Sequence, residues 1–438
     1  MVGWMLHAVL VVSADPPDDL NWPSFRGRFA CGVAAGSAPV QWDVQTGNNV
    51  AWSTPIPGLG HSSPVVWGDR IFLTTAVAES GKSQLKPGYY RDIEPVEGDG
   101  SHEWRVLCLD TAEGRIFWQQ TVHTGVPKTK RHPKSTHANP SCATDGQYVV
   151  SYFGSEGLYC HDLDGRLRWK KDLGVLDAGY YLSPAAQWGV ATSPVIHGGR
   201  VILQCDVQID GFLAAFDLNN GSQIWRTLRD DVPTWSTPTI DVRPGRAQIL
   251  VNGFKHIGGY SLEEGVELWR LSGTGDIPVP TPIVAHGLAF ITSAHGGLPP
   301  IYAIRLDAAG SLTAGQANGA IAWHKSRGGN YMQTPIVVGD YLFLCSDGGV
   351  LSCFDARTGV RHFRQRLPVQ QTYTASAVSA GGYIYLTAET GQVVIVKASA
   401  SFEVVGTNRL GETTMATPSI AAGTIYFRTR RHLVAVRQ

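Results

Sequence analysis

The feature that most constrains the fold is a module that recurs along almost the whole chain. Most copies open with Ser or Thr before Pro, and a later strand ends in a small residue, an apolar residue and Asp. Most openings are roughly 42 to 54 residues apart, which is typical of a four-stranded propeller blade. The openings are Ser63-Pro64, Asn139-Pro140, Ser193-Pro194, Thr237-Pro238, Thr281-Pro282, Thr334-Pro335, Ser376-Ala377 and Thr417-Pro418.

The third strand of the module gives the clearest register. Two residues before its Asp position, cysteine alternates with alanine and glycine, in the order Cys108, Cys160, Ala215, Gly259, Ala303, Cys353, Ile395 and Ala435. Free cysteine behaves as a small hydrophobe inside a core. We therefore expect these three cysteines to pack against neighbours rather than to react or to bind a metal.

A large ring follows a turn glycine in the next strand and should fill the space between neighbouring blades: Trp118, Trp169, Trp225, Trp269, Trp323 and Phe363. The final module, 415–438, stops after three strands, and the segment 49–54 offers a fourth strand with Trp52 in the missing position. A ring closed in this way has no open edge. The sequence predicts an all-β, eight-bladed propeller of four-stranded antiparallel blades, with the last blade closed by an N-terminal strand.

The N-terminus has the pattern of an export signal. The apolar run from Trp4 to Val12 is too short to span a bilayer but suits the core of a signal peptide, although no Lys or Arg precedes Arg26. We divide the chain into a signal peptide (1–14), a lead-in segment (15–39) and one propeller (40–438). We expect a periplasmic or secreted, monomeric protein without a transmembrane segment.

The overall charge argues against one class of partner. The chain has 36 Lys and Arg against 36 Asp and Glu, so it has no excess positive charge to neutralise nucleic-acid phosphates. It also has no Cys-x-x-Cys pair among its 7 cysteines, which removes the common zinc-knuckle patterns.

The string Cys-Phe-Asp-Ala-Arg-Thr-Gly at 353–359 resembles the pyrroloquinoline-quinone (PQQ) repeat of quinoprotein alcohol dehydrogenases and of the assembly lipoprotein BamB. Segment 21–27 resembles the Trp-Pro-x-Phe-Arg-Gly lead-in of exported members, and segments 60–69 and 153–159 resemble a bacterial branch of this superfamily. The resemblance covers about residues 40–438 and implies the propeller fold. The dehydrogenases carry adjacent cysteines and calcium ligands, and this chain has no Cys-Cys pair. We therefore predict no cofactor, with PQQ and calcium disfavoured.

Three long insertions, 76–104, 123–137 and 174–190, fall on one face of the predicted ring. Loops of this length are commonly functional. Residues just before each inner strand should surround the channel mouth there, and their rings suit stacking on a sugar, a quinone or a peptide side chain. The same side chains would alternatively plug the channel. The ligand-binding candidates are His61, His137, Trp188, Trp235, Tyr331 and Tyr373.

The second insertion carries a dense basic run, 128–134. Its cations are candidate contacts to an anionic partner or substrate: Lys128, Lys130, Arg131 and Lys134. One alternative is a solvated charged loop. Another is a tether to the acidic residues of the first insertion: Asp92, Glu94, Glu97, Asp99 and Glu103. His61 and His137 share an offset, but two histidines are not a site, and we predict no metal.

These features favour an exported scaffold that binds a protein or a glycan through its long-loop face, without redox chemistry. The alternative is an enzyme that uses the central funnel, either a polysaccharide hydrolase or lyase or an atypical PQQ-dependent dehydrogenase. We assign no catalytic residue, because no nucleophile elbow, phosphate loop or zinc-protease motif occurs.

Overall fold

The computed structural model describes residues 20–438 except 82, 90–92, 274, 296–297 and 315–318. The predicted signal peptide, 1–14, lies outside the described residues. Within them the helical elements are two short 3-10 turns, η1 (Arg28–Ala30) and η2 (Gly154–Glu156). None of the described helices is long and apolar enough to cross a bilayer.

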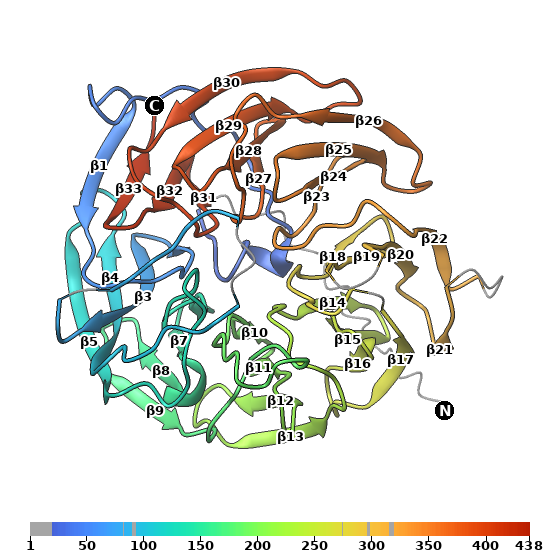
Figure 1. Cartoon of the computed structure of the whole chain (residues 1–438), viewed down its shortest axis with the longest axis horizontal. Helices are drawn as coiled ribbons and strands as arrows, with labels where there is room; N and C mark the ends of the chain where they lie inside the picture. The colour runs from blue at the N-terminus through green and yellow to red at the C-terminus, as the bar shows by residue number, and fades with distance from the viewer. Residues whose placement is uncertain (1–19, 82, 90–92, 274, 296–297, 315–318) are drawn as a thin grey trace, which may run out of the picture.

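Eight blades, each with four antiparallel strands, surround a central axis in sequence order, as predicted (Figure 1). The first four blades are β2 (Val65–Trp67), β3 (Arg70–Ala78), β4 (His102–Asp110) and β5 (Ile116–Gly125); β6 (Ala143–Thr144), β7 (Tyr148–Tyr152), β8 (Leu158–Asp162) and β9 (Leu167–Lys171); β10 (Val195–His197), β11 (Arg200–Cys205), β12 (Phe212–Asp217) and β13 (Gln223–Leu228); and β14 (Thr239–Arg243), β15 (Arg246–Val251), β16 (Ile257–Ser261) and β17 (Glu267–Leu271).

The other four blades complete the ring, and the last one takes its outer strand from the start of the chain. They are β18 (Ile283–Ala285), β19 (Leu288–Thr292), β20 (Ile301–Arg305) and β22 (Ile321–Lys325); β23 (Ile336–Val338), β24 (Tyr341–Cys345), β25 (Val350–Asp355) and β26 (Arg361–Arg366); β27 (Val378–Ala380), β28 (Tyr383–Thr387), β29 (Gln392–Lys397) and β30 (Val404–Arg409); and β31 (Ser419–Ala421), β32 (Thr424–Arg428), β33 (His432–Val436) and β1 (Val50–Pro55).

The repeated small residue and the repeated ring lie opposite each other on neighbouring strands. Cys108 pairs with Trp118, and Cys160 pairs with Trp169. The small side chain lets the indole lie flat and reach the turn of the next blade. A Cβ at Gly165 would stand 2.7 Å from the Trp118 ring, so this turn requires glycine. The Trp118 indole N–H also donates to a carbonyl of the next blade, that of Leu163, at 2.8 Å.

The fourth blade departs from this pattern. The connection between β20 and β22 contains an extra strand, β21 (Gly310–Leu312), which pairs in parallel with β17 beside Trp269. Trp269 therefore donates within its own blade, to the Gln248 side chain at 3.2 Å, instead of to the next turn. The sequence analysis did not anticipate this strand, because a short insertion with Gly is also compatible with an ordinary loop.

The Ser/Thr-Pro openings have a structural explanation. The hydroxyl of one inner strand accepts the backbone N–H of the preceding inner strand, at 2.9 to 3.0 Å, so these side chains clasp neighbouring blades around the channel. The acceptors are Ser141, Ser193, Thr237, Thr334, Ser376 and Thr417. In the second blade the hydroxyl comes from Ser141 and not from the Asn139 position, so the predicted register of this opening was wrong by two residues.

The described part of the lead-in crosses the end of the channel opposite the insertions. Trp22 pairs with Val66 of the first blade, and Val33 pairs with Ser379 of the seventh. Between them, Arg26 is fully buried and donates to the carbonyls of Ala377 at 2.6 Å and Pro335 at 2.9 Å. Burial lowers the pKa of Arg26 to about 10. The channel is therefore closed at this end by the lead-in.

The three repeat-position cysteines Cys108, Cys160 and Cys353 are fully buried and free, as the register predicts. Burial raises the pKa of each of these thiols to about 12. They are therefore packing residues.

Candidate functional site

The three insertions bond to one another at the open end of the channel. The backbone N–H of Val96 in the first insertion donates to the Arg131 carbonyl of the second at 2.8 Å. The Trp188 indole of the third insertion donates to the Ile93 carbonyl of the first at 3.0 Å. Gly88 reaches the seventh blade, where its N–H donates to Glu389 at 2.6 Å. The insertions therefore form a shared wall around the mouth.

A cavity of about 530 Å³ lies inside this wall. Its floor includes Phe25 of the lead-in, and hydroxyl residues of the inner-strand clasp face it. Eight lining residues, each two positions before the clasp hydroxyl or its equivalent, form one register: His61, Asn139, Ala191, Trp235, Val279, Met332, Thr374 and Met415. The repeat thus places one side chain per blade at the mouth.

A chain of five aromatic rings runs from the fourth blade to the sixth, and four of them line the cavity: Trp235, Trp188, His295 and Tyr331. Trp235 contacts Trp188 with ring centroids 5.6 Å apart, and Trp188 stacks on Tyr180 at 5.4 Å with an angle of 4° between the planes. Tyr180 meets the edge of His295 at 5.8 Å, and His295 stacks on Tyr331 at 5.8 Å. This wall offers several ring faces to a ligand.

Four of the six ligand-binding candidates line the cavity: His61, Trp188, Trp235 and Tyr331. His137 and Tyr373 do not, and both expectations need correction. The two-residue register shift of the second blade puts Asn139 at the mouth in place of His137. Thr374 takes the mouth position of the seventh blade, so Tyr373 is buried and donates to the Val369 carbonyl at 3.0 Å.

His137 belongs instead to a cluster at the base of the insertions. Its Nε2 lies 2.9 Å from Asp99, and its ring meets that of His102 with centroids 5.0 Å apart. The ligand-type atoms of Asp99, His102 and His137 lie within 4.8 Å of one another. Both carboxylate oxygens of Asp99 already accept from the Arg131 guanidinium, at 2.6 and 3.1 Å. We therefore interpret the cluster as a tether.

The basic run of the second insertion is paired with carboxylates. Arg131, almost fully buried, binds Asp99, and Lys130 lies 2.5 Å from Glu97. The other two cations pair with carboxylates outside the first insertion. Lys128 lies 3.4 Å from Asp172, and Lys134 lies 2.5 Å from Glu389. Burial would raise the pKa of Asp99, but hydrogen bonds from His137 and Arg131 outweigh it and hold that pKa well below the usual range. The geometry matches the tether alternative.

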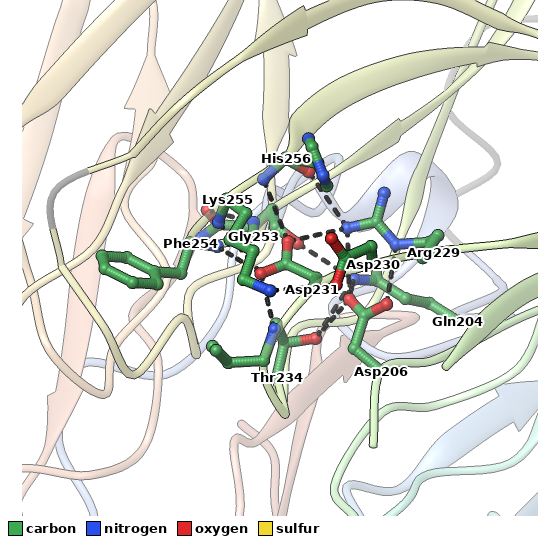
Figure 2. Close-up of polar contacts among 12 residues, drawn as sticks. Gln204, Asp206, Arg229, Asp230, Asp231, Thr234, Gly253, Phe254, Lys255 and His256 are labelled. Atoms are coloured by element: carbon green, nitrogen blue, oxygen red, sulfur yellow. Dashed lines mark hydrogen bonds and ion pairs between the residues drawn. The ribbon is translucent and has the colours of Figure 1, made fainter. Parts of the chain in front are cut away.

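A buried ionic network supports the aromatic wall next to Trp235 (Figure 2). Arg229 donates to Asp206 at 2.7 Å and to Asp231 at 3.2 Å, and none of these side chains is exposed. Burial opposes the charge of Arg229, but the two carboxylates outweigh it and raise its pKa. Asp206 in turn accepts from the Thr234 hydroxyl at 2.9 Å, which fixes the chain just before Trp235. The sequence analysis missed this network, because Asp206 lies in the loop after β11 whereas Arg229, Asp231 and Thr234 lie in the loop after β13.

The lining also contains groups that the sequence analysis missed. Asp347, half-buried in the turn between β24 and β25, lines the cavity beside Tyr331. Burial raises the pKa of Asp347 to about 6. The only sequence signal was Asp before Gly, which indicates a hairpin turn and not a site. On the first blade, burial lowers the pKa of His61 to about 4, and the neutral ring donates to the Lys134 carbonyl at 3.0 Å.

The ring of eight blades and the register of Trp against small residues define a propeller of the PQQ-like repeat superfamily. A family model described as outer membrane protein assembly factor BamB matches residues 102–365, more than half of the sequence. The chain therefore belongs to this family. A search among curated proteins finds no match.

Solved structures share the fold at low sequence identity. BamB from Moraxella catarrhalis is 14% identical, with a TM-score of 0.58 over 88% of this chain and 98% of that one. A europium-containing methanol dehydrogenase is 10% identical, with a TM-score of 0.63 over 94% and 89% of the two chains. The quinohemoprotein alcohol dehydrogenase from Comamonas testosteroni is 12% identical, with a TM-score of 0.61 over 97% and 81%. These likenesses show the fold alone.

The cavity residues do not fit PQQ. This quinone is a tricarboxylate and needs several cationic or N–H donors around it. Lys134 is the only lysine or arginine among the described lining residues. Its ammonium group is already bound to Glu389 and to the Gly88 carbonyl, the latter at 3.0 Å. Asp347 adds a negative charge to the same wall. We therefore derive no chemistry through this cofactor.

Proposed function

We propose that this protein acts outside the cytoplasm as a binding scaffold, and that it holds part of a glycan or protein partner in the cavity at its insertion-bearing face without redox chemistry. One observation carries the proposal: a cavity of about 530 Å³, closed below by the lead-in and lined on one side by four aromatic rings, Trp235, Trp188, His295 and Tyr331. Such a concave, mostly apolar site with few polar groups is typical of ligand binding. Membership of the BamB family supports a role at the cell envelope.

The alternative of a polysaccharide enzyme has one observation in its favour. Asp347 and Glu389 both lie near the mouth, and two carboxylates are the usual requirement for glycoside hydrolysis. Glu389, however, is 3% exposed and is engaged by Lys134, by the Thr374 hydroxyl and by the Gly88 N–H. A carboxylate held by three partners is poorly placed to attack a sugar or to activate water. Binding is therefore the function that the geometry favours.

The test uses a substitution that fills the cavity and leaves the rest of the ring unchanged. Ala191 lies at the mouth position of the third blade, so Ala191→Trp should occupy the cavity. Val266, 55% exposed on an outer hairpin, gives the matched control Val266→Trp. Wild type and both variants are applied to a glycan array and to an extract of envelope proteins. We expect retained molecules to be lost with Ala191→Trp and kept with Val266→Trp; equal retention by all three would overturn the proposal.

A further inference from the structure

The charges around the cavity are unbalanced. Three carboxylates stand at or just behind the cavity wall: Asp276, Asp347 and Glu389. Among the described residues that line the cavity, Lys134 is the only lysine or arginine. Lys134 lies 2.5 Å from Glu389, so these two charges offset each other. The net charge left on this side of the mouth is negative.

Two guanidinium groups act on His61, on the other side of the ring: Arg131 of the second insertion and Arg428 at the end of β32 in the eighth blade. Their charges help to lower the pKa of His61, after the larger effect of burial. Arg131 is bound to Asp99, and neither guanidinium is among the residues that line the cavity. No arginine among the described lining residues therefore stands beside Asp276 or Asp347.

Asp347 has few partners for a carboxylate in this position. It accepts the Met332 backbone N–H at 3.4 Å, a long hydrogen bond. Lys134 acts on it through its charge, while Glu389 opposes it. Desolvated carboxylates are costly unless a donor or a cation reaches them. A ligand that brings positive charge into the cavity would remove this cost.

Asp276 extends the negative wall next to the aromatic rings. Its partners are the His295 ring at 2.9 Å and the hydroxyls of Tyr180 at 3.2 Å and Tyr181 at 3.4 Å. His295 and Tyr331 present stacked faces between Asp276 and Asp347. Ring faces attract organic cations through their quadrupoles.

We propose that the ligand of this cavity carries an organic ammonium group, as in an amino sugar or a lysine side chain, which sits against Asp347 and the ring face of Tyr331. The carboxylate supplies the charge, and the aromatic wall holds the aliphatic carbons next to the nitrogen. This inference rests on the proposed function, because it names the chemistry of the group that enters the same cavity.

The test uses pairs of probes that differ in charge. Choline is compared with 3,3-dimethylbutan-1-ol, glucosamine with N-acetylglucosamine, and N-α-acetyl-lysine methylamide with its Nε-acetyl form, by calorimetry on the full chain. Each is titrated into wild type, Asp347→Asn and Asp340→Asn, a control on the exposed turn of the same blade, where the carboxylate is 67% exposed. Thermal unfolding confirms that the variants are folded.

We expect at least one ammonium probe to bind tenfold or more tightly than its neutral partner, a preference that Asp347→Asn abolishes and Asp340→Asn keeps. The inference is overturned if no ammonium probe exceeds its neutral partner, or if Asp347→Asn retains the preference. The proposed function fails separately, through an unchanged retention profile of Ala191→Trp. A neutral ligand lost only in Ala191→Trp would therefore leave the binding function intact and remove the ammonium group.

Discussion

Trp52, near the start of the chain, lies opposite Ala435, near its end, on neighbouring strands of the last blade. Its indole N–H donates to the Thr111 carbonyl of the first blade at 3.1 Å, and its ring covers the turn glycine Gly114. One side chain therefore joins the two termini within a blade and joins that blade to the next. Trp52 can be buried only when both ends of the chain are folded. This contact therefore closes the ring.

Replacing Trp52 with Ala should destabilise the whole propeller. The change removes a ring that is 9% exposed and leaves a cavity between two blades, so we expect a loss of about 3 to 5 kcal/mol in the free energy of unfolding. Guanidinium unfolding followed by tryptophan fluorescence measures it. Phe117→Ala, at a ring 48% exposed on β5, is the control and should lose less than about 1 kcal/mol. Similar losses in both variants would contradict this role.

Arg26 should hold the lead-in in the channel. Arg26→Met leaves the carbonyls of Ala30, Ala377 and Pro335 without their buried donor, and we expect a loss of about 2 to 4 kcal/mol. Limited proteolysis should then cut the lead-in before the blades. Arg28→Met, at an exposed position two residues later, should leave the cleavage pattern unchanged. Resistance of Arg26→Met to cleavage would show that other contacts hold the segment.

The tether between the insertions should weaken in acid. The folded-state pKa of Asp99 is depressed, so its contribution is present above the pKa of the unfolded chain, about 4, and is lost as pH falls below it. We expect wild type to lose about 1 kcal/mol more stability than Asp99→Asn between pH 6 and pH 3. Unfolding curves at a series of pH values measure the difference. Parallel curves for the two proteins would exclude Asp99 as the titrating group.

Asp347→Asn should stabilise the ligand-free protein. The folded-state pKa of Asp347 is raised to about 6, so its ionised form is disfavoured by burial and the cost appears as pH rises from about 4 through 6. Lys134, Glu389 and Tyr331 are the titratable groups that act on it or adjoin it. We expect the variant to gain about 1 to 2 kcal/mol at pH 7.5 and nothing at pH 4. A loss at pH 7.5 would show that the carboxylate is structural.

Much of the architecture could be predicted because the same sequence pattern recurs in blade after blade. Cys108 opposite Trp118 and Ala435 opposite Trp52 follow one rule, in which a small residue makes room for a ring. The site was predictable only in part. Trp188, Trp235 and Tyr331 were found because the repeat places residues before each inner strand at the mouth. His137 was misplaced by a two-residue register shift that only the Ser141 clasp reveals.

The sequence by itself determined the number of blades, their closure by 49–54 and the face that bears the insertions, because each depends on periodicity along the chain. Only the tertiary structure decided that Asp347 and Tyr331 line one cavity and that Lys134 pairs with Glu389. It also decided that Arg26 anchors the lead-in across the opposite end of the channel. Those contacts join blades and loops far apart in sequence. No local pattern records them, because their geometry exists only once the ring has closed.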